Sequence, residues 1–144
     1  MHVRILYATA FVLCGAWSAQ TAAQESLLTI RSKDGGADFD LTVTEIKREP
    51  RKSFLVVPGF SHRSAAGSRW LMCVYTALAM RRGFSYWSVV YPEGSSETLV
   101  VGFPETPTED ISKTLGSEFS GPLVTPEQPA SVNVFATRLC GFRP

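Results

Sequence analysis

The chain has 144 residues, of which 14 are Lys or Arg and 13 are Asp or Glu, so its formal net charge is +1. This near-neutral balance argues against a dedicated nucleic-acid-binding protein, and the length suits one small domain. With two histidines and three cysteines in the whole chain, few arrangements for metal or redox chemistry are open to it.

The N-terminal residues have the pattern of a secretory signal peptide. A basic start that includes Arg4 precedes an uncharged, mostly apolar run at 5–17, and small residues follow at 18–24. We expect cleavage near Ala23. The apolar run is shorter than the ~20 residues of a spanning helix, which favours a cleaved signal over a membrane anchor. A lipid-anchored Cys14 is the other alternative, but Leu13 occupies a position where a lipobox has a small residue.

Cleavage divides the chain into a signal peptide (1–23) and one mature domain (24–144). The mature chain keeps 13 basic and 13 acidic residues, because only Arg4 is lost. No later apolar run is long enough to cross a bilayer, so we expect no transmembrane segment in the mature chain.

The mature sequence predicts strands, one strong helix and a long polar loop. Alternating or continuous apolar runs predict strands at 27–30, 39–46, 53–57, 84–91 and 98–103. Between the third and fourth, residues 64–84 predict a helix, with Ser61, Ser64 and Ser68 as candidate N-caps and Gly83 as its C-terminal stop. Residues 104–129 are rich in proline and acids and predict a loop with at most one short helix near 109–115. The alternating run at 131–142 predicts a closing strand.

These elements predict an α+β fold in which one main helix packs on a largely antiparallel sheet of four to six strands. From Trp70 to Met80 only Thr76 is not apolar, so the helix has no clear polar face. Such a helix is buried on most sides or offers an apolar stripe to a partner.

The two cysteines of the mature chain, Cys73 and Cys140, are an even pair in an exported protein. Such a pair favours a disulfide, which would close a loop of more than sixty residues. The alternative is two separate thiols, with Cys73 a small core residue of the helix.

A serine and a histidine, Ser61 and His62, follow the apolar strand and the Pro58-Gly59 turn. A small hydrolase that uses them is one alternative function. However, the chain has no G-x-S-x-G nucleophile elbow, and His62 is the only histidine of the mature chain. A catalytic base also needs a carboxylate to orient it, and adjacency of Ser61 and His62 in sequence does not supply that geometry. An exposed loop histidine is the better interpretation.

Basic residues gather at one turn, where Lys47, Arg48, Arg51 and Lys52 fall within six positions. They are either a solvated surface or a contact for an anionic surface such as lipid headgroups or polyanionic glycans. Neither a phosphate-binding loop nor a set of metal ligands with the usual spacing is present, so we expect no cofactor and no metal.

The block at 54–90 resembles the central segment of small bacterial exported proteins, many of them lipid-anchored. In that family a strand ends in a glycine turn, and an Ala- and Leu-rich helix, a Gly-aromatic pair and an aromatic strand follow. The matching positions here are Gly59, Leu71, Tyr75, Ala77, Ala79, Gly83, Phe84 and either Tyr86 or Trp87. The family's helix usually carries Arg-Ala-Ala-Glu near its middle, where this chain reads VYTALA. The resemblance implies an α+β envelope protein with no catalytic residue.

We therefore expect a periplasmic or secreted protein that acts as a non-catalytic binding or accessory module, not an enzyme. Its partner would be an envelope component or another protein, and not a nucleic acid. A structural homodimer joined through the Trp70–Met80 helix is the third alternative.

Overall fold

The structure, a computed structural model, describes residues 27–91, 96–116 and 124–142. The expected signal peptide and its cleavage site lie outside these residues. In chain order the strands are β1 (Thr29–Arg31), β2 (Thr42–Glu49), β3 (Lys52–Val56), β4 (Tyr86–Val90), β5 (Thr98–Gly102) and β6 (Val124–Ser131). The helices are α1 (Ala65–Arg81), α2 (Ile111–Leu115) and α3 (Val132–Arg138), with the 3-10 turns η1 (Ser32–Gly35) and η2 (Phe60–His62).

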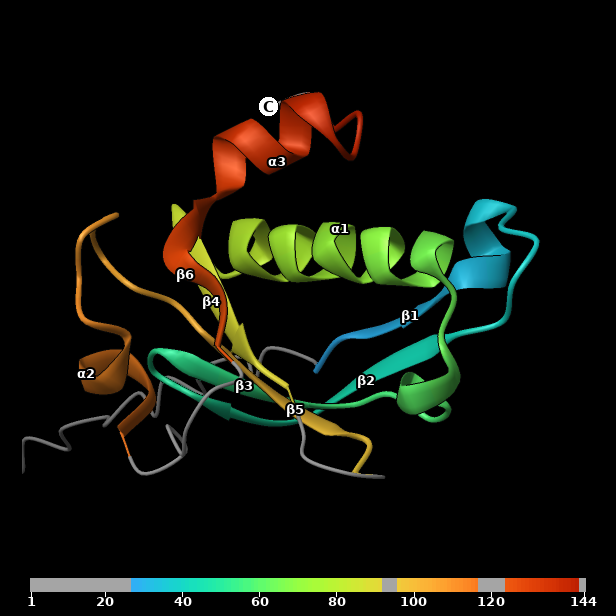
Figure 1. The fold of residues 1–144 in the computed structure, drawn as a ribbon, viewed down its shortest axis with the longest axis horizontal. Helices are drawn as coiled ribbons and strands as arrows, with labels where there is room; N and C mark the ends of the chain where they lie inside the picture. Colours follow the sequence, from blue (N-terminus) through green and yellow to red (C-terminus); the bar gives the residue numbers. More distant parts are fainter. Residues whose placement is uncertain (1–26, 92–95, 117–123, 143–144) are drawn as a thin grey trace, which may run out of the picture.

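The six strands form one sheet in the order β1-β2-β3-β5-β4-β6, and every neighbouring pair is antiparallel. The expected α+β fold is confirmed, with the strand count at the upper end of the expected range. β1 and β6 are the two edge strands. Figure 1 shows α1 across one face of the sheet and α3 beyond it, so this side of the molecule has three layers.

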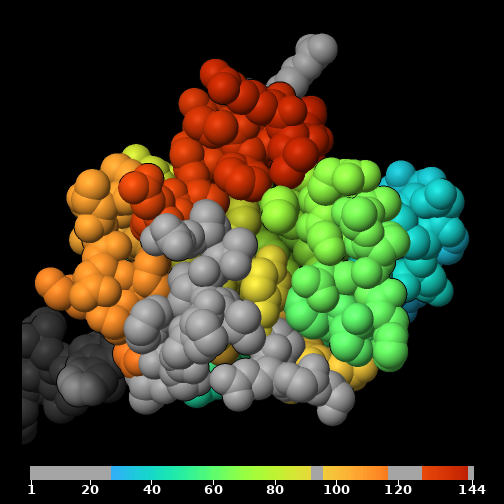
Figure 2. Space-filling model, in the orientation of Figure 1, coloured from blue at the N-terminus to red at the C-terminus, as the bar shows by residue number. Residues whose placement is uncertain are grey.

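The main core lies between the sheet and α1. Strand residues and helix residues of this core are buried together. From the strands they are Val43, Leu55, Trp87, Val89, Leu99 and Val101, and from α1 they are Leu71, Val74, Tyr75, Leu78 and Ala79. The other side of α1 lies under α3, as the contact between the two helices shows (Figure 2). This double cover explains why the helix sequence lacks a polar face.

The ends of α1 follow from its sequence. Of the three candidate N-caps, Ser64 is the one used, because its hydroxyl accepts a hydrogen bond from the Gly67 N–H at 3.1 Å. At the other end Gly83 has a φ of 76°, and the Phe84 N–H donates to the Ala79 carbonyl at 2.9 Å. This pairing is a Schellman stop, which needs a left-handed residue such as glycine at this position.

The C-terminal part of the sequence differs from expectation. Residues 131–142 do not form the closing strand; they begin with Ser131 as N-cap and continue as α3. The buried positions Val132 and Ala136, with Phe135 partly buried against the core, have the i, i+3, i+4 spacing of a helix. The apolar residues of this segment therefore form one face of a helix, although their order in the sequence resembles the alternation of a strand.

The closing strand is instead β6, whose first six residues lie in the segment at 104–129 that we expected to be a loop. Its prolines, Pro126 and Pro129, are typical of loops, but an edge strand tolerates them where no ladder N–H is required. The register against β4 shifts between Trp87 and Val89, so the proline-containing stretch is an irregularity in the pairing. The short helix expected near 109–115 is present as α2.

Candidate functional site

An open groove of about 880 Å³ runs along one side of α1. Three parts of the chain form its walls: β1 with η1, one stripe of α1, and the turn that follows α3. The lining residues are Thr29, Ile30, Arg31, Asp34, Gly35, Arg69, Trp70, Cys73, Val74, Ala77, Leu139, Cys140 and Phe142.

The stripe of α1 has helical spacing. Arg69, Cys73 and Ala77 are four residues apart, and Trp70 and Val74 lie beside them, so all five project from one side of the helix. This side borders the core: Val74 is buried there, whereas Arg69 is exposed and Trp70, Cys73 and Ala77 are partly buried. It presents mostly apolar surface to the groove.

A disulfide holds the C-terminal wall in place. Cys73 and Cys140 are bonded, with 5.5 Å between their α-carbons, so the expected pairing is confirmed. Cys140 reaches α1 from the turn that follows α3, whereas the sequence predicted that it lies in a closing strand at 131–142. Gly141, with a φ of 68°, then directs the chain back, and the Phe142 N–H donates to the Ala136 carbonyl at 2.8 Å.

Trp70 is the principal aromatic side chain of the groove. Its ring makes an edge-to-face contact with Phe39, with 6.1 Å between ring centroids, and it is only partly buried. This contact holds part of the ring in place, and Trp70 lines the groove together with Cys73 and Cys140. Aromatic surface that is held in place and partly exposed is typical of ligand sites.

The charged residues of the groove are two arginines, Arg31 and Arg69, and one acid, Asp34, all of them exposed. Among the described residues, neither guanidinium forms an ion pair. The site therefore combines an apolar floor with an excess of positive charge at its rim. It suits a ligand that has an apolar body and an acidic group.

Ser61 and His62 lie elsewhere, in η2, and both are exposed. His62 lines a smaller hollow of about 330 Å³ together with Asp40, Arg63 and Ser64. The Ser64 hydroxyl is engaged as the N-cap of α1. No hydrogen bond joins Ser61, His62 and Asp40 in the part of the chain that the structure describes, so a relay is not assembled there.

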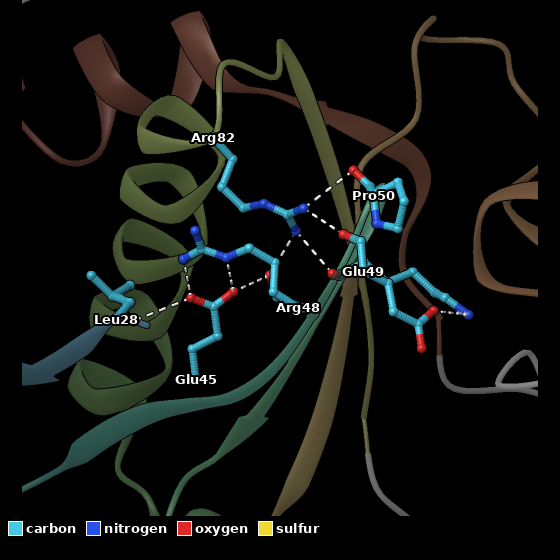
Figure 3. Close-up of polar contacts among 8 residues, drawn as sticks. Leu28, Glu45, Arg48, Glu49, Pro50 and Arg82 are labelled. Atoms are coloured by element: carbon cyan, nitrogen blue, oxygen red, sulfur yellow. Dashed lines mark hydrogen bonds and ion pairs between the residues drawn. The ribbon is translucent and has the colours of Figure 1, made fainter. Parts of the chain in front are cut away.

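The basic turn is bound to acids and carbonyls of the protein itself (Figure 3). Arg48 pairs with the buried carboxylate of Glu45, and the Lys47 ammonium lies 2.6 Å from Glu49. Lys52 lies 3.2 Å from the same Glu49 and also donates to the Leu115 carbonyl at 3.2 Å.

Arg51 extends from this turn to α2. Its Nη2 lies 2.6 and 2.7 Å from the two carboxylate oxygens of Glu109, and it also donates to the Phe103 carbonyl. Asp110, next to Glu109, caps α2 by accepting from the Ser112 N–H at 3.0 Å. Each of the four basic residues thus has a partner within the fold. Contact with an external anionic surface stays a prediction, with less charge available for it than the sequence suggests.

Glu45 is the central acid of this network. Its carboxylate accepts from the Leu28 N–H at 3.1 Å and the Ser53 hydroxyl at 2.6 Å, in addition to Arg48. Burial alone raises the pKa of Glu45, but these hydrogen bonds and the charge of Arg48 outweigh it, so the pKa lies below its usual value of 4.5. Arg82, at the end of α1, donates to the same Ser53 hydroxyl at 2.8 Å and extends the network to the helix.

Among the described residues, no group of three or more His, Cys, Asp or Glu side chains is placed to hold a metal ion. In the same residues no helix combines the length and apolar character needed to span a bilayer.

No protein-family model matches the chain, and no similar protein was found among curated proteins or solved structures. The groove itself was not predicted from the sequence. The spacing of Arg69, Cys73 and Ala77 indicated one wall of the groove. The wall formed by the C-terminal turn depends on α3, and the sequence predicted a strand in its place.

Proposed function

We propose that the protein is an exported, non-catalytic binding module whose groove takes an elongated apolar ligand with an acidic group. The observation that carries this proposal is the groove itself, an open hollow with an apolar floor, a partly exposed Trp70, and Arg31 and Arg69 at its rim. A few placed polar groups around an apolar surface are what ligand sites of this size require.

Export is part of the proposal. A disulfide between Cys73 and Cys140 persists in oxidising compartments such as the periplasm or the cell exterior. The signal-peptide pattern and the resemblance to small envelope proteins point to the same place. The intact mass of protein recovered from the periplasm or medium should correspond to a chain that begins near Gln24. A mass that retains Met1, or a lipid on Cys14, would contradict export with simple cleavage.

Binding can be tested by tryptophan fluorescence. The mature chain expected after cleavage keeps two tryptophans, and Trp87 is buried in the core with 1% of its surface exposed, so changes in the groove report mainly on Trp70. We would titrate the oxidised protein with two probes: sodium dodecanoate, and a pool of hexapeptides with alternating apolar residues and free carboxyl ends. At least one probe should give a saturable change that Trp70→Phe abolishes.

Arg69→Gln should weaken the binding of that probe about fivefold, since an exposed ion pair contributes up to about 1 kcal/mol. Arg138→Gln is the matched control, because it removes the same charge from an exposed site of α3 that does not line the groove. The proposal is wrong if neither probe saturates, or if the two arginine variants behave alike.

A further inference from the structure

β1 is an edge strand of the sheet, and its outer edge borders the groove. Antiparallel pairing directs the main-chain groups of alternate residues toward the neighbouring strand, and those of the residues between toward the other side. The hydrogen bonds between β1 and β2 show which residues of β1 bond to β2 and which direct their main-chain groups outward.

The Glu45 N–H donates to the Leu28 carbonyl at 2.8 Å, and the Ser32 N–H donates to the Leu41 carbonyl at 2.9 Å. Leu28 and Ser32 are therefore residues that bond to β2, and Ile30, midway between them, is the third. The intervening residues, Thr29 and Arg31, direct their N–H and C=O groups away from the sheet.

Thr29 and Arg31 both line the groove and are exposed. Their outward main-chain groups offer two donors and two acceptors at the spacing that a further β-strand requires. Ile30 packs partly against the core, so its side chain faces the α1 side of the sheet. A strand added beside β1 would place every second side chain on that same side, along the apolar stripe of α1.

Among the described residues the two edges of the sheet differ, because β6 carries features that β1 lacks. β6 carries Pro126 and Pro129, which have no N–H to offer, and a register irregularity against β4. Both features are devices that prevent strand addition. β1 has neither proline nor a register shift in its pairing with β2.

From these observations, and resting on the proposed function above, we propose that the occupant of the groove is an extended peptide segment that pairs as an added strand with Thr29 and Arg31. Its alternate apolar side chains lie in the groove beside Trp70 and Val74. Its acidic group, a side chain or the terminal carboxylate, lies by Arg69. An acyl chain has no amide N–H or C=O groups along its length. It could therefore not form hydrogen bonds with the outward main-chain groups of Thr29 and Arg31.

The first test uses the hexapeptide from the pool that binds most tightly. Two versions of this peptide are made, one with N-methyl groups on its odd residues and one with N-methyl groups on its even residues. In a strand only one of these sets donates to β1, so we expect one version to bind at least tenfold more weakly than the other. Equal affinities of the two versions would overturn strand addition.

The second test changes the protein. Thr29→Pro removes an outward N–H and keeps the bonds between β1 and β2, because an edge strand tolerates proline where its N–H faces outward. We expect at least tenfold weaker peptide binding, with the melting temperature nearly unchanged. Unchanged peptide affinity in the folded variant would contradict the inference.

Hydrogen exchange separates the remaining outcomes. Bound peptide should protect the amides of Thr29 and Arg31. If only dodecanoate binds and these amides stay unprotected, the groove remains a ligand site but the inference about peptides is wrong. If these amides are protected without peptide and the mass doubles with concentration, a second copy of the chain occupies the edge and the inference also fails. If no probe binds, the proposed function falls as well.

Discussion

Glu45 is a charged residue that is almost completely buried, with 1% of its surface exposed. The alternation that places Leu41 and Val43 inward continues to Glu45, so a carboxylate enters the core at the point where the β2–β3 register shifts. Arg48, Ser53 and the Leu28 N–H satisfy it there. The sequence alternation predicts its direction, but its partners depend on the bulge and cannot be predicted from sequence.

Glu45→Gln should lower the free energy of unfolding by about 3–5 kcal/mol, because it leaves Arg48 beside the core without its carboxylate. Glu105→Gln is the control, since Glu105 is exposed, and it should change stability by less than about 0.5 kcal/mol. Urea unfolding followed by circular dichroism measures both. Equal midpoints for the two variants would show that the network does not stabilise the fold.

The same residue gives the stability a pH dependence. Because the folded pKa of Glu45 lies below the unfolded value near 4.5, its contribution is fully present above that pH and is lost as the pH falls through the folded pKa. The wild-type protein should therefore lose stability on acidification below about pH 4.5 more steeply than Glu45→Gln. Parallel curves for the two proteins would contradict this assignment.

Gly102 is a second residue whose identity the packing requires. A Cβ there would lie 2.7 Å from Leu115 Cδ2 and 3.1 Å from Thr114 Cγ2, both on α2. Gly102→Ala should destabilise the protein by about 1–3 kcal/mol through overpacking. Gly35→Ala, where a Cβ has no atom within 4 Å, is the matched control and should be nearly neutral in thermal unfolding. A neutral Gly102→Ala would mean that α2 moves freely against β5.

His62→Ala addresses the alternative enzyme function. His62 is exposed in η2 and the groove lies elsewhere, so the variant should keep wild-type stability and wild-type probe affinity. Loss of any hydrolytic activity in this folded variant, with activity present in the wild type, would restore the hydrolase hypothesis.

At the level of elements, local signals predicted β3, α1, the β4–β5 hairpin and α2, because caps, turns and apolar runs there agree with one another. They failed at β6 and α3. Pro126 and Pro129 are locally loop-forming, and only their place at the sheet edge makes a strand possible. The apolar residues of α3 fit both a strand and a helix, and the contact with α1 decides between them.

α3 depends on its connection to α1 more than on its own sequence. Seven residues are too few for a stable isolated helix, and it is held by the disulfide and by the contact of Phe135 with Trp87, whose ring centroids are 5.2 Å apart. The disulfide spans a sequence separation of 67 residues, for which the chain-entropy model gives about 4 kcal/mol.

Reduction should therefore lower the free energy of unfolding by several kcal/mol and increase hydrogen exchange in α3 before it does so in the central strands. Urea unfolding of oxidised protein, reduced protein and the Cys73→Ser/Cys140→Ser double variant measures this effect, and the last two should agree. Unchanged exchange in α3 after reduction would show that its packing alone holds it.

For the whole molecule, the groove is a product of topology. Its three walls come from β1, α1 and the turn after α3, which lie far apart in the sequence, and the disulfide joins the last two. The sequence predicted the fold class and the cysteine pair. It could not predict the groove, because one wall requires α3 and another requires β1 to be at the edge of the sheet.

The central claim is that this groove, and not the His62 hollow or the basic turn, is where the protein binds. Amide chemical-shift mapping of the oxidised mature protein during titration with the best-binding hexapeptide tests the claim directly. We expect the largest shifts at Thr29, Arg31, Ala77 and Leu139. Shifts confined to Asp40 and His62, or to residues 47–52, with the groove amides unchanged, would contradict it.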